Sequence, residues 1–196
     1  MVSPLDVARY FIFRAYEDGR EALMTNMKVQ KLLYYTQSLY LALFEEPLFE
    51  DEIQAWRYGP ACPPAYRFYR EFEEKQLPIP QKNELMALSE EVQNLLEEVW
   101  EYFGEHHAYF LSGQTHLEFP WKKARKGLPA DAASQEPIVV SDMQILGQQK
   151  LEEMERSHPV YKKVIPFLLE EAFSVTTPKT YIKQGEVHDW LTSLLA

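Results

Sequence analysis

The chain has 196 residues, 46% of them hydrophobic and 14% aromatic, with a formal net charge of −10 and a single cysteine, Cys62. This composition supports a folded core and excludes a largely disordered chain, and the acidic balance opposes a general nucleic-acid binder, which needs a basic surface for phosphates. One cysteine excludes an internal disulfide and a cysteine-based zinc site, while the lack of a signal-like start and of a long apolar run predicts a cytoplasmic protein.

Two helices are predicted at the beginning of the chain. Ser3 and Asp6 form a capping signal, and apolar residues at helical spacing follow it up to residues 18–19, where the helix should end. Residues 25–26 supply a cap for a longer second helix through about Phe44. The apolar stripe of this second helix is broad enough for a central core helix.

The segment 52–66 combines aromatic residues, a glycine and three prolines between charged neighbours. Each proline fixes φ and removes a backbone donor, and Gly59 allows the chain to turn. We therefore predict a short strand over residues 53–58, then a stiff turn, then a helix from about Pro64. A rigid turn beside large aromatics suits either a packing anchor or a recognition surface.

Helices joined by loops are expected from there to residue 157. Apolar spacing and caps place the helices at about residues 64–74, 89–103, 107–112, 120–126 and 141–157, with loops at 76–88 and 127–137. The predicted fold class is therefore mostly α: a single compact helical domain, residues 1–157, with a short β element near residues 53–58.

The residue pattern changes over residues 158–196, where prolines interrupt the chain before a predicted terminal amphipathic helix. The apolar stripe of that helix consists of Val187, Trp190, Leu191, Leu194 and Leu195. Two interpretations stay open: the helix packs back onto its own domain, or it lies in the groove of a partner. We treat residues 158–196 as a C-terminal extension.

Three stretches, in order, resemble the SocA-like antitoxins, also called the Panacea domain. They are Asn26–Gln37, Ala55–Pro60 preceded by Pro47-Leu48-Phe49, and Thr115–Trp121. The resemblance covers roughly residues 5–155, and one departure is Gly59-Pro60-Ala61 where the family often has Gly-Pro-Val. It implies a mostly helical protein that acts by binding protein, either as an antitoxin paired with a toxin or as a phage-associated protein. One kind in the family delivers its toxin to a Clp-type protease.

The stiff turn is the expected partner-binding surface. Arg57, Tyr58 and Tyr66 surround it, and a rigid turn presents such side chains with little ordering cost on binding. Lys31, from the first of the three stretches, is assigned to the same surface. Trp56 suits core packing or a binding hot spot. The residues assigned to holding the motif together are Trp56, Gly59, Pro60, Thr115, His116, Pro120 and Trp121.

The candidates for catalytic or metal chemistry have structural explanations. His106, His107 and His116 lack acidic or cysteine neighbours at ligand spacing, so we expect no metal site. The ring of His116 suits a hydrogen bond to the backbone that locks its loop. Cys62 suits a small buried thiol, because no base lies near it in sequence. We expect no enzyme activity and no cofactor.

The predicted function is an antitoxin that neutralises a cognate toxin by direct binding. The acidic charge would steer a basic toxin toward it. One alternative is an adaptor that delivers the bound toxin to a Clp-type protease. The other is a nucleic-acid-binding regulator that uses the basic cluster Lys122, Lys123, Arg125 and Lys126, although such a cluster also suits a solvated helix end or an acidic patch on a protein partner.

Overall fold

The computed structural model describes residues 2–157 of the chain. The predictions for the terminal helix and for the rest of residues 158–196 lie outside the described residues. The fold below belongs to the compact unit Met1–Met154, with the last turn of its final helix reaching residue 157.

The described part is mostly helical with one small sheet, which confirms the predicted fold class. No helix in residues 2–157 is both long and apolar enough to cross a membrane. The α-helices are α1 Pro4–Glu17, α2 Asn26–Phe44, α3 Pro63–Tyr69, α4 Glu90–Phe103, α5 Ala108–Leu117, α6 Phe119–Ala124 and α7 Val140–Ser157. The strands are β1 Gln54–Trp56 and β2 Gly59–Ala61, and single 3₁₀ turns cover Glu21–Leu23, Arg70–Phe72 and Lys82–Glu84.

The predicted caps are present at the start of the first two helices. The Ser3 hydroxyl accepts a hydrogen bond from the Asp6 amide at 3.2 Å, and the Asp6 carboxylate accepts one from the Ser3 amide at 2.9 Å. The hydroxyl of Thr25 accepts from the amide of Lys28 at the start of α2. Because these orphan amides are satisfied locally, both helices begin where the sequence predicts.

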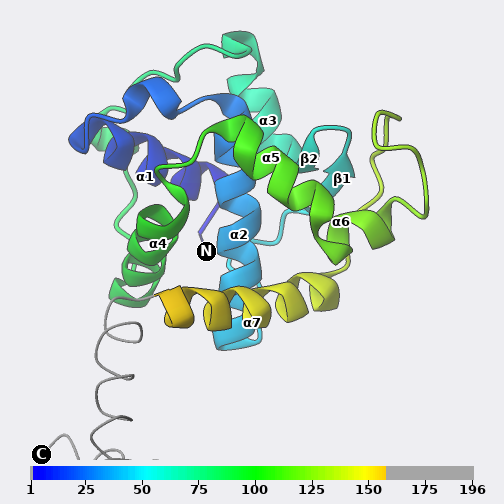
Figure 1. Ribbon diagram of the computed structural model, residues 1–196. Coiled ribbons are helices and arrows are strands. Elements are labelled where there is room, and N and C mark those ends of the chain that lie inside the picture. The colour runs from blue at the N-terminus through cyan, green and yellow to red at the C-terminus, as the bar shows by residue number, and fades with distance from the viewer. Residues whose placement is uncertain (1, 158–196) are drawn as a thin grey trace, which may run out of the picture. The chain divides into compact units, whose positions relative to one another are not determined.

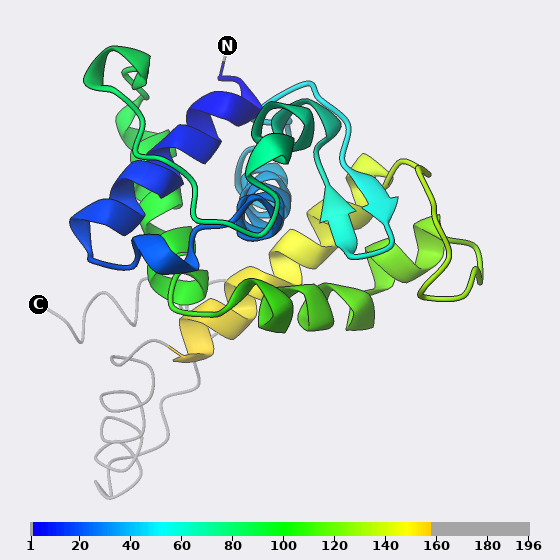
Figure 2. The same cartoon turned by 90° about the horizontal axis from the view of Figure 1, so that it is seen from above.

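Helix α2 is the central element of the unit. Almost every residue in its first fourteen positions is buried, so its surface is covered on all sides rather than along one stripe. Figure 1 shows α1 and α4 on one side of α2 and α5 on the other, and Figure 2 looks nearly along its axis. Its buried positions include apolar residues on several faces and polar residues, such as Lys28, Gln30 and Lys31, that form hydrogen bonds, so no single apolar stripe stands out.

Helix α7 crosses α2 at a glycine. A Cβ atom at Gly147 would overlap the backbone carbonyl of Ser38, so the two backbones approach more closely than any side chain allows. The crossing is visible at the lower end of α2 in Figure 1. This helix was predicted to begin at Ser141, and it begins one residue earlier, at Val140.

The segment around the Gly-Pro pair differs from the prediction of one strand and a turn. It is an antiparallel hairpin in which Trp56 pairs with Gly59 and Ala55 pairs with Pro60, so the turn residues are Arg57 and Tyr58. Gly59 follows the turn with φ +94°, the conformation in which a glycine closes such a hairpin. Pro60 is accepted in β2 because a two-stranded sheet leaves edge positions where no amide donor is needed.

Candidate partner-binding site

Side chains from three helices, α2, α5 and α6 with its C-cap residue, hold the backbone of the hairpin in place. Nearly every carbonyl from Ala55 to Pro60 accepts a hydrogen bond from a side chain far away in sequence. The donor–acceptor pairs are Arg125 Nη1 to Ala55 O at 3.2 Å, Trp121 Nε1 to Trp56 O at 2.9 Å, His116 Nε2 to Arg57 O at 3.0 Å, Ser112 Oγ to Tyr58 O at 2.9 Å, and Lys31 Nζ to Pro60 O at 2.9 Å. We call this set the carbonyl clamp.

The start of helix α3 is fixed to α2 in the same way. The side-chain oxygen of Gln30 accepts from the Cys62 amide at 2.8 Å, and the side-chain nitrogen of Asn26 donates to the Tyr66 carbonyl at 3.1 Å. Gln30 and Asn26 also bond to each other at 2.9 Å. Burial raises the pKa of the Cys62 thiol to about 12, so this cysteine is a protonated packing residue at neutral pH.

The residues assigned to holding the motif together lie around the hairpin. Trp121 is buried, the His116 ring lies 4.3 Å from it, and the Arg125 guanidinium lies 4.6 Å over its face. Burial lowers the pKa of His116, and the hydrogen bond to the carbonyl requires the proton on Nε2. Pro120 is buried in the first turn of α6, and the buried Thr115 donates to the Ser112 carbonyl at 2.8 Å.

Trp56 and Gly59 have different environments within the hairpin. Trp56 is half-buried, its indole N–H donates to the Gln54 side chain at 2.8 Å, and its ring meets that of Tyr66 edge-on at 4.8 Å. Gly59 is buried against the clamp: a Cβ atom there would lie 2.5 Å from Thr115 Oγ1 and 2.7 Å from Lys31 Nζ. The close approach of β2 to α2 and α5 therefore depends on glycine at this position.

A cavity of about 630 Å³ opens beside the hairpin, and the four predicted partner-binding residues all line it. Its rim carries Arg57 and the aromatic rings of Tyr58, which is 55% exposed, and Tyr66, which is 38% exposed. Its floor includes Lys31, which is 2% exposed. The structure therefore places three of the four side chains on the surface and the fourth beneath them.

The sequence reasoning missed four exposed charged or aromatic residues of the lining: Arg70, Glu73, Glu74 and Tyr109. Arg70 follows α3, and Tyr109 lies at the start of α5, where it is 55% exposed and its hydroxyl donates to Glu74 at 2.8 Å. A large exposed aromatic in the first turn of a helix is a signal that the sequence contains, but only the packing of α5 beside the hairpin brings it to the cavity.

The basic cluster does not form one continuous cationic surface. Arg125 is 1% exposed and belongs to the carbonyl clamp. Lys123 pairs with Asp142 at 2.8 Å, and Lys126 pairs with Glu136 at 2.8 Å. The two lysine side chains are largely exposed, so these pairs contribute little stability, but they reduce the charge offered to phosphates.

His106 and His107 point to different cavities, as their adjacency on a helix end predicts. The ring of His107 accepts from the Tyr109 amide at 3.4 Å and lines the cavity beside the hairpin. The ring of His106 lies 4.6 Å from Phe110 in a second cavity of about 370 Å³. Among the described residues no group of three His, Cys, Asp or Glu side chains is arranged to hold a metal ion.

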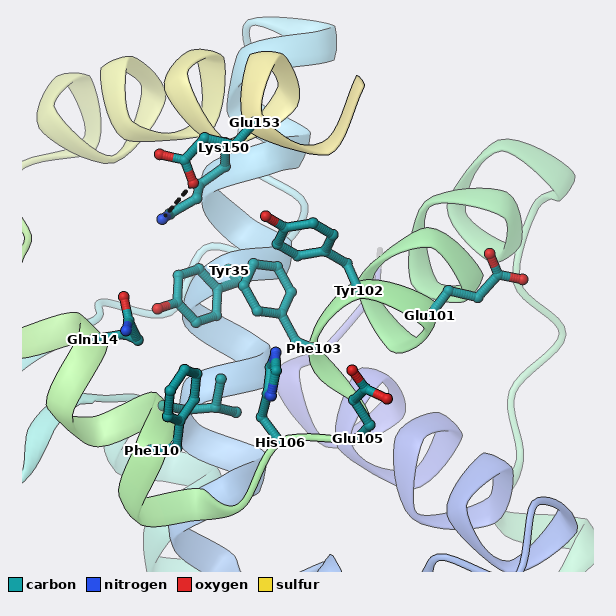
Figure 3. Close-up of a pocket in the computed structure, with 11 residues that line it drawn as sticks. Tyr35, Glu101, Tyr102, Phe103, Glu105, His106, Phe110, Gln114, Lys150 and Glu153 are labelled. Carbon is teal, nitrogen blue, oxygen red and sulfur yellow. Dashed lines mark hydrogen bonds and ion pairs between the residues drawn. The ribbon is translucent and has the colours of Figure 1, made fainter. Parts of the chain in front are cut away.

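The second cavity has aromatic walls and charged residues at its edges (Figure 3). Tyr35 and Phe103 stack at 4.1 Å, and Lys150 pairs with Glu153 at 2.9 Å and with Glu118 at 3.4 Å. Sequence reasoning singled out only His106 of its lining. This cavity lies between α2, α4, α5 and α7, away from the hairpin.

Comparison with known proteins finds a family model that matches the part of the chain containing the hairpin. Residues 29–122 match the family described as antitoxin SocA-like, Panacea domain, which confirms the resemblance. The matched range runs from α2 to α6 and includes the hairpin and most of the residues that line the cavity beside it. Searches of curated proteins and of solved structures found no match.

Proposed function

We propose that this chain, which carries a SocA-like Panacea domain, is the antitoxin of a toxin–antitoxin pair and neutralises its toxin by direct binding at the hairpin. The domain itself supports an antitoxin role in general terms. The observation that carries the finer proposal is the location of Arg57, Tyr58 and Tyr66 together on the rim of one cavity.

The rim has the composition of a binding hot spot. Tyrosine, tryptophan and arginine dominate such sites, and here Arg57 lies 5.1 Å over the ring of Tyr58 while Tyr66 contacts Trp56. The carbonyl clamp fixes the backbone beneath these side chains. Binding therefore restricts the side-chain rotamers but costs little backbone entropy. A pre-ordered surface retains more of its contact energy as affinity.

The net charge favours a basic toxin. The formal net charge of −10 attracts a cationic partner over a distance of about 10 Å at 0.1 M salt and accelerates its association. Rising ionic strength should therefore slow association more than it changes dissociation.

Neutralisation by rim variants tests the proposal. We expect Tyr58→Ala and Arg57→Glu to lose rescue of cells that express the toxin encoded by the adjacent reading frame, while their circular dichroism and melting stay close to those of the parent. Phe68→Ala and Arg67→Glu are matched controls, because both residues are exposed on α3 and lie outside the cavity lining. Full rescue by the two rim variants would remove the hairpin as the binding surface.

A protease-deficient host separates direct neutralisation from delivery to a protease. Direct binding predicts that rescue persists in a host without its Clp-type protease and that the toxin co-purifies at equal stoichiometry. Rescue that disappears in this host, with toxin levels restored, would favour the adaptor.

A further inference from the structure

The floor of the cavity beside the hairpin contains a buried amine without an acidic partner. Lys31 donates to the Pro60 carbonyl at 2.9 Å and is 2% exposed. None of the ion pairs among residues 2–157 includes it. A buried ammonium usually has a carboxylate or several carbonyl partners, because leaving it unpaired is costly.

A second buried lysine on the same helix also donates to a backbone carbonyl and has no ion pair among residues 2–157. Lys28 Nζ donates to the Gly104 carbonyl after the end of α4, and it lies 5.5 Å from the Trp100 ring. Burial lowers the pKa of Lys28 to about 8, although the partial negative charge at the end of α4 favours the ammonium form. Lys28 is not part of the cavity lining, so the two lysines differ in what faces them.

The groups around Lys31 leave a positive floor under a mixed rim. Glu118 is the acidic group whose charge acts on Lys31 most strongly, and it is engaged with Tyr35 at 3.0 Å and Lys150 at 3.4 Å. His116, on α5, is near enough for the two charges to repel. The other ionisable groups of the lining are Arg57, Tyr58, Tyr66, Arg70, Glu73, Glu74, His107 and Tyr109.

We propose that the cavity receives an acidic side chain of the toxin, an Asp or Glu beside an apolar residue, with its carboxylate at Lys31 and the apolar neighbour against the aromatic rim. This inference rests on the proposed function and specifies what the partner inserts. Charge complementarity supports it, since Lys31, Arg57 and Arg70 bring three basic groups to the lining against the two acidic groups Glu73 and Glu74, and Glu74 accepts a hydrogen bond from Tyr109. The volume of about 630 Å³ lies within the range of sites that enclose a small ligand.

Proton uptake on binding follows from this arrangement. Burial lowers the pKa of Lys31 to about 7, with the charge of Glu118 opposing the shift. At pH 8 the Lys31 amine is therefore neutral in most molecules of the free protein. A carboxylate at hydrogen-bond distance favours the ammonium form and raises the pKa of Lys31, so binding at pH 8 should take up a proton at this amine.

Calorimetry of the toxin with the full antitoxin chain measures this proton. Titrations at pH 8 in phosphate and in Tris, which differ in protonation enthalpy, should give an uptake close to one proton for the parent and for Lys28→Met. Lys31→Met should take up almost no proton. The affinity of the parent for the toxin should fall as the pH rises above 7, and the affinity of Lys31→Met should not. No uptake by the parent complex, or full uptake by Lys31→Met, would overturn the inference. If Tyr58→Ala still abolishes binding in that case, the antitoxin proposal stands.

A small probe tests the same chemistry without the toxin. We expect 3-phenylpropionate to raise the melting temperature of the parent at pH 7 more than its neutral analogue 3-phenylpropionamide does, and the difference to remain in Lys28→Met. Equal stabilisation of the parent by acid and amide would contradict a carboxylate site at Lys31, whatever the toxin does.

Discussion

Replacement of Gly59 by alanine is the sharpest test of how the hairpin is held. Gly59 has φ +94°, and a Cβ atom would lie 2.5 Å from Thr115 Oγ1 and 2.7 Å from Lys31 Nζ. Both neighbours are buried, and both use these atoms in hydrogen bonds, so neither moves without breaking one. The substitution therefore adds a packing conflict to a backbone conflict.

The two contributions can be separated with a second glycine. Gly127 has φ +81°, and a Cβ atom there would meet nothing within 4 Å. Alanine in the left-handed region costs about 1–2 kcal/mol, and forcing an extra methyl into a packed site costs about 1–3 kcal/mol more. We expect Gly59→Ala to lower the free energy of unfolding by about 2–5 kcal/mol and Gly127→Ala by about 1–2 kcal/mol.

Urea unfolding of the two variants, followed by circular dichroism, measures the difference. The midpoint should fall much further for Gly59→Ala, with a similar slope if the transition stays two-state. Rescue of toxin-expressing cells should fall with it, because a displaced β2 moves Tyr58. Equal losses in the free energy of unfolding for both variants would show that the clamp residues move to accommodate a methyl group at position 59. The argument for a rigid hairpin would then fail.

Three further predictions follow from single contacts. The folded pKa of Lys31, about 7, lies below its usual 10.5, so the unfolded chain binds more protons between these two pH values. The free energy of unfolding should therefore rise with pH across that window by up to about 1.4 kcal/mol per pH unit from this group. Lys31→Met should flatten the rise in urea titrations at pH 7, 8 and 9, and an unchanged slope would refute this prediction. Gly147→Ala should lower the melting temperature by forcing α7 away from Ser38, at a cost of about 3 kcal/mol; an unchanged value would refute the close crossing. Trp121→Phe keeps an aromatic ring but removes the indole N–H and part of the buried ring volume, which leaves the Trp56 carbonyl unpaired. Chemical denaturation should show a loss of at least about 1–3 kcal/mol, and no loss would mean that water replaces the indole N–H.

Local signals were sufficient to predict where α1 and α2 begin, whereas α5 runs to Leu117, beyond the predicted end at residue 112. The Ser3–Asp6 capping box and the Thr25 cap act within one turn, so the sequence contains all that sets the starts of α1 and α2. The hairpin was not predicted correctly, because three prolines near Gly59 suggested that the turn lies there. Proline at an edge position loses no ladder bond, and the actual turn residues, Arg57 and Tyr58, have no strong turn propensity of their own.

The candidate site was predictable only in part, for a related reason. Arg57, Tyr58 and Tyr66 are close in sequence to the rigid segment, so a local argument finds them. Tyr109 and Arg70 reach the cavity through the packing of α5 and the 3₁₀ turn after α3. The burial of Lys31 also depends on tertiary packing: β2 covers it, and that packing requires Gly59.

The carbonyl clamp explains why residues so far apart in the chain belong to one structural feature. Lys31, His116 and Trp121 each donate to a different hairpin carbonyl, so losing one of them loosens the strand that the others hold. Tyr66 and Tyr109 form the rim without donating to the hairpin carbonyls. Substitutions at the rim can therefore change the partner while the hairpin stays rigid, whereas substitutions in the clamp should weaken binding to every partner through loss of order. Measuring affinity and hydrogen exchange of the hairpin on the same variants separates these two effects.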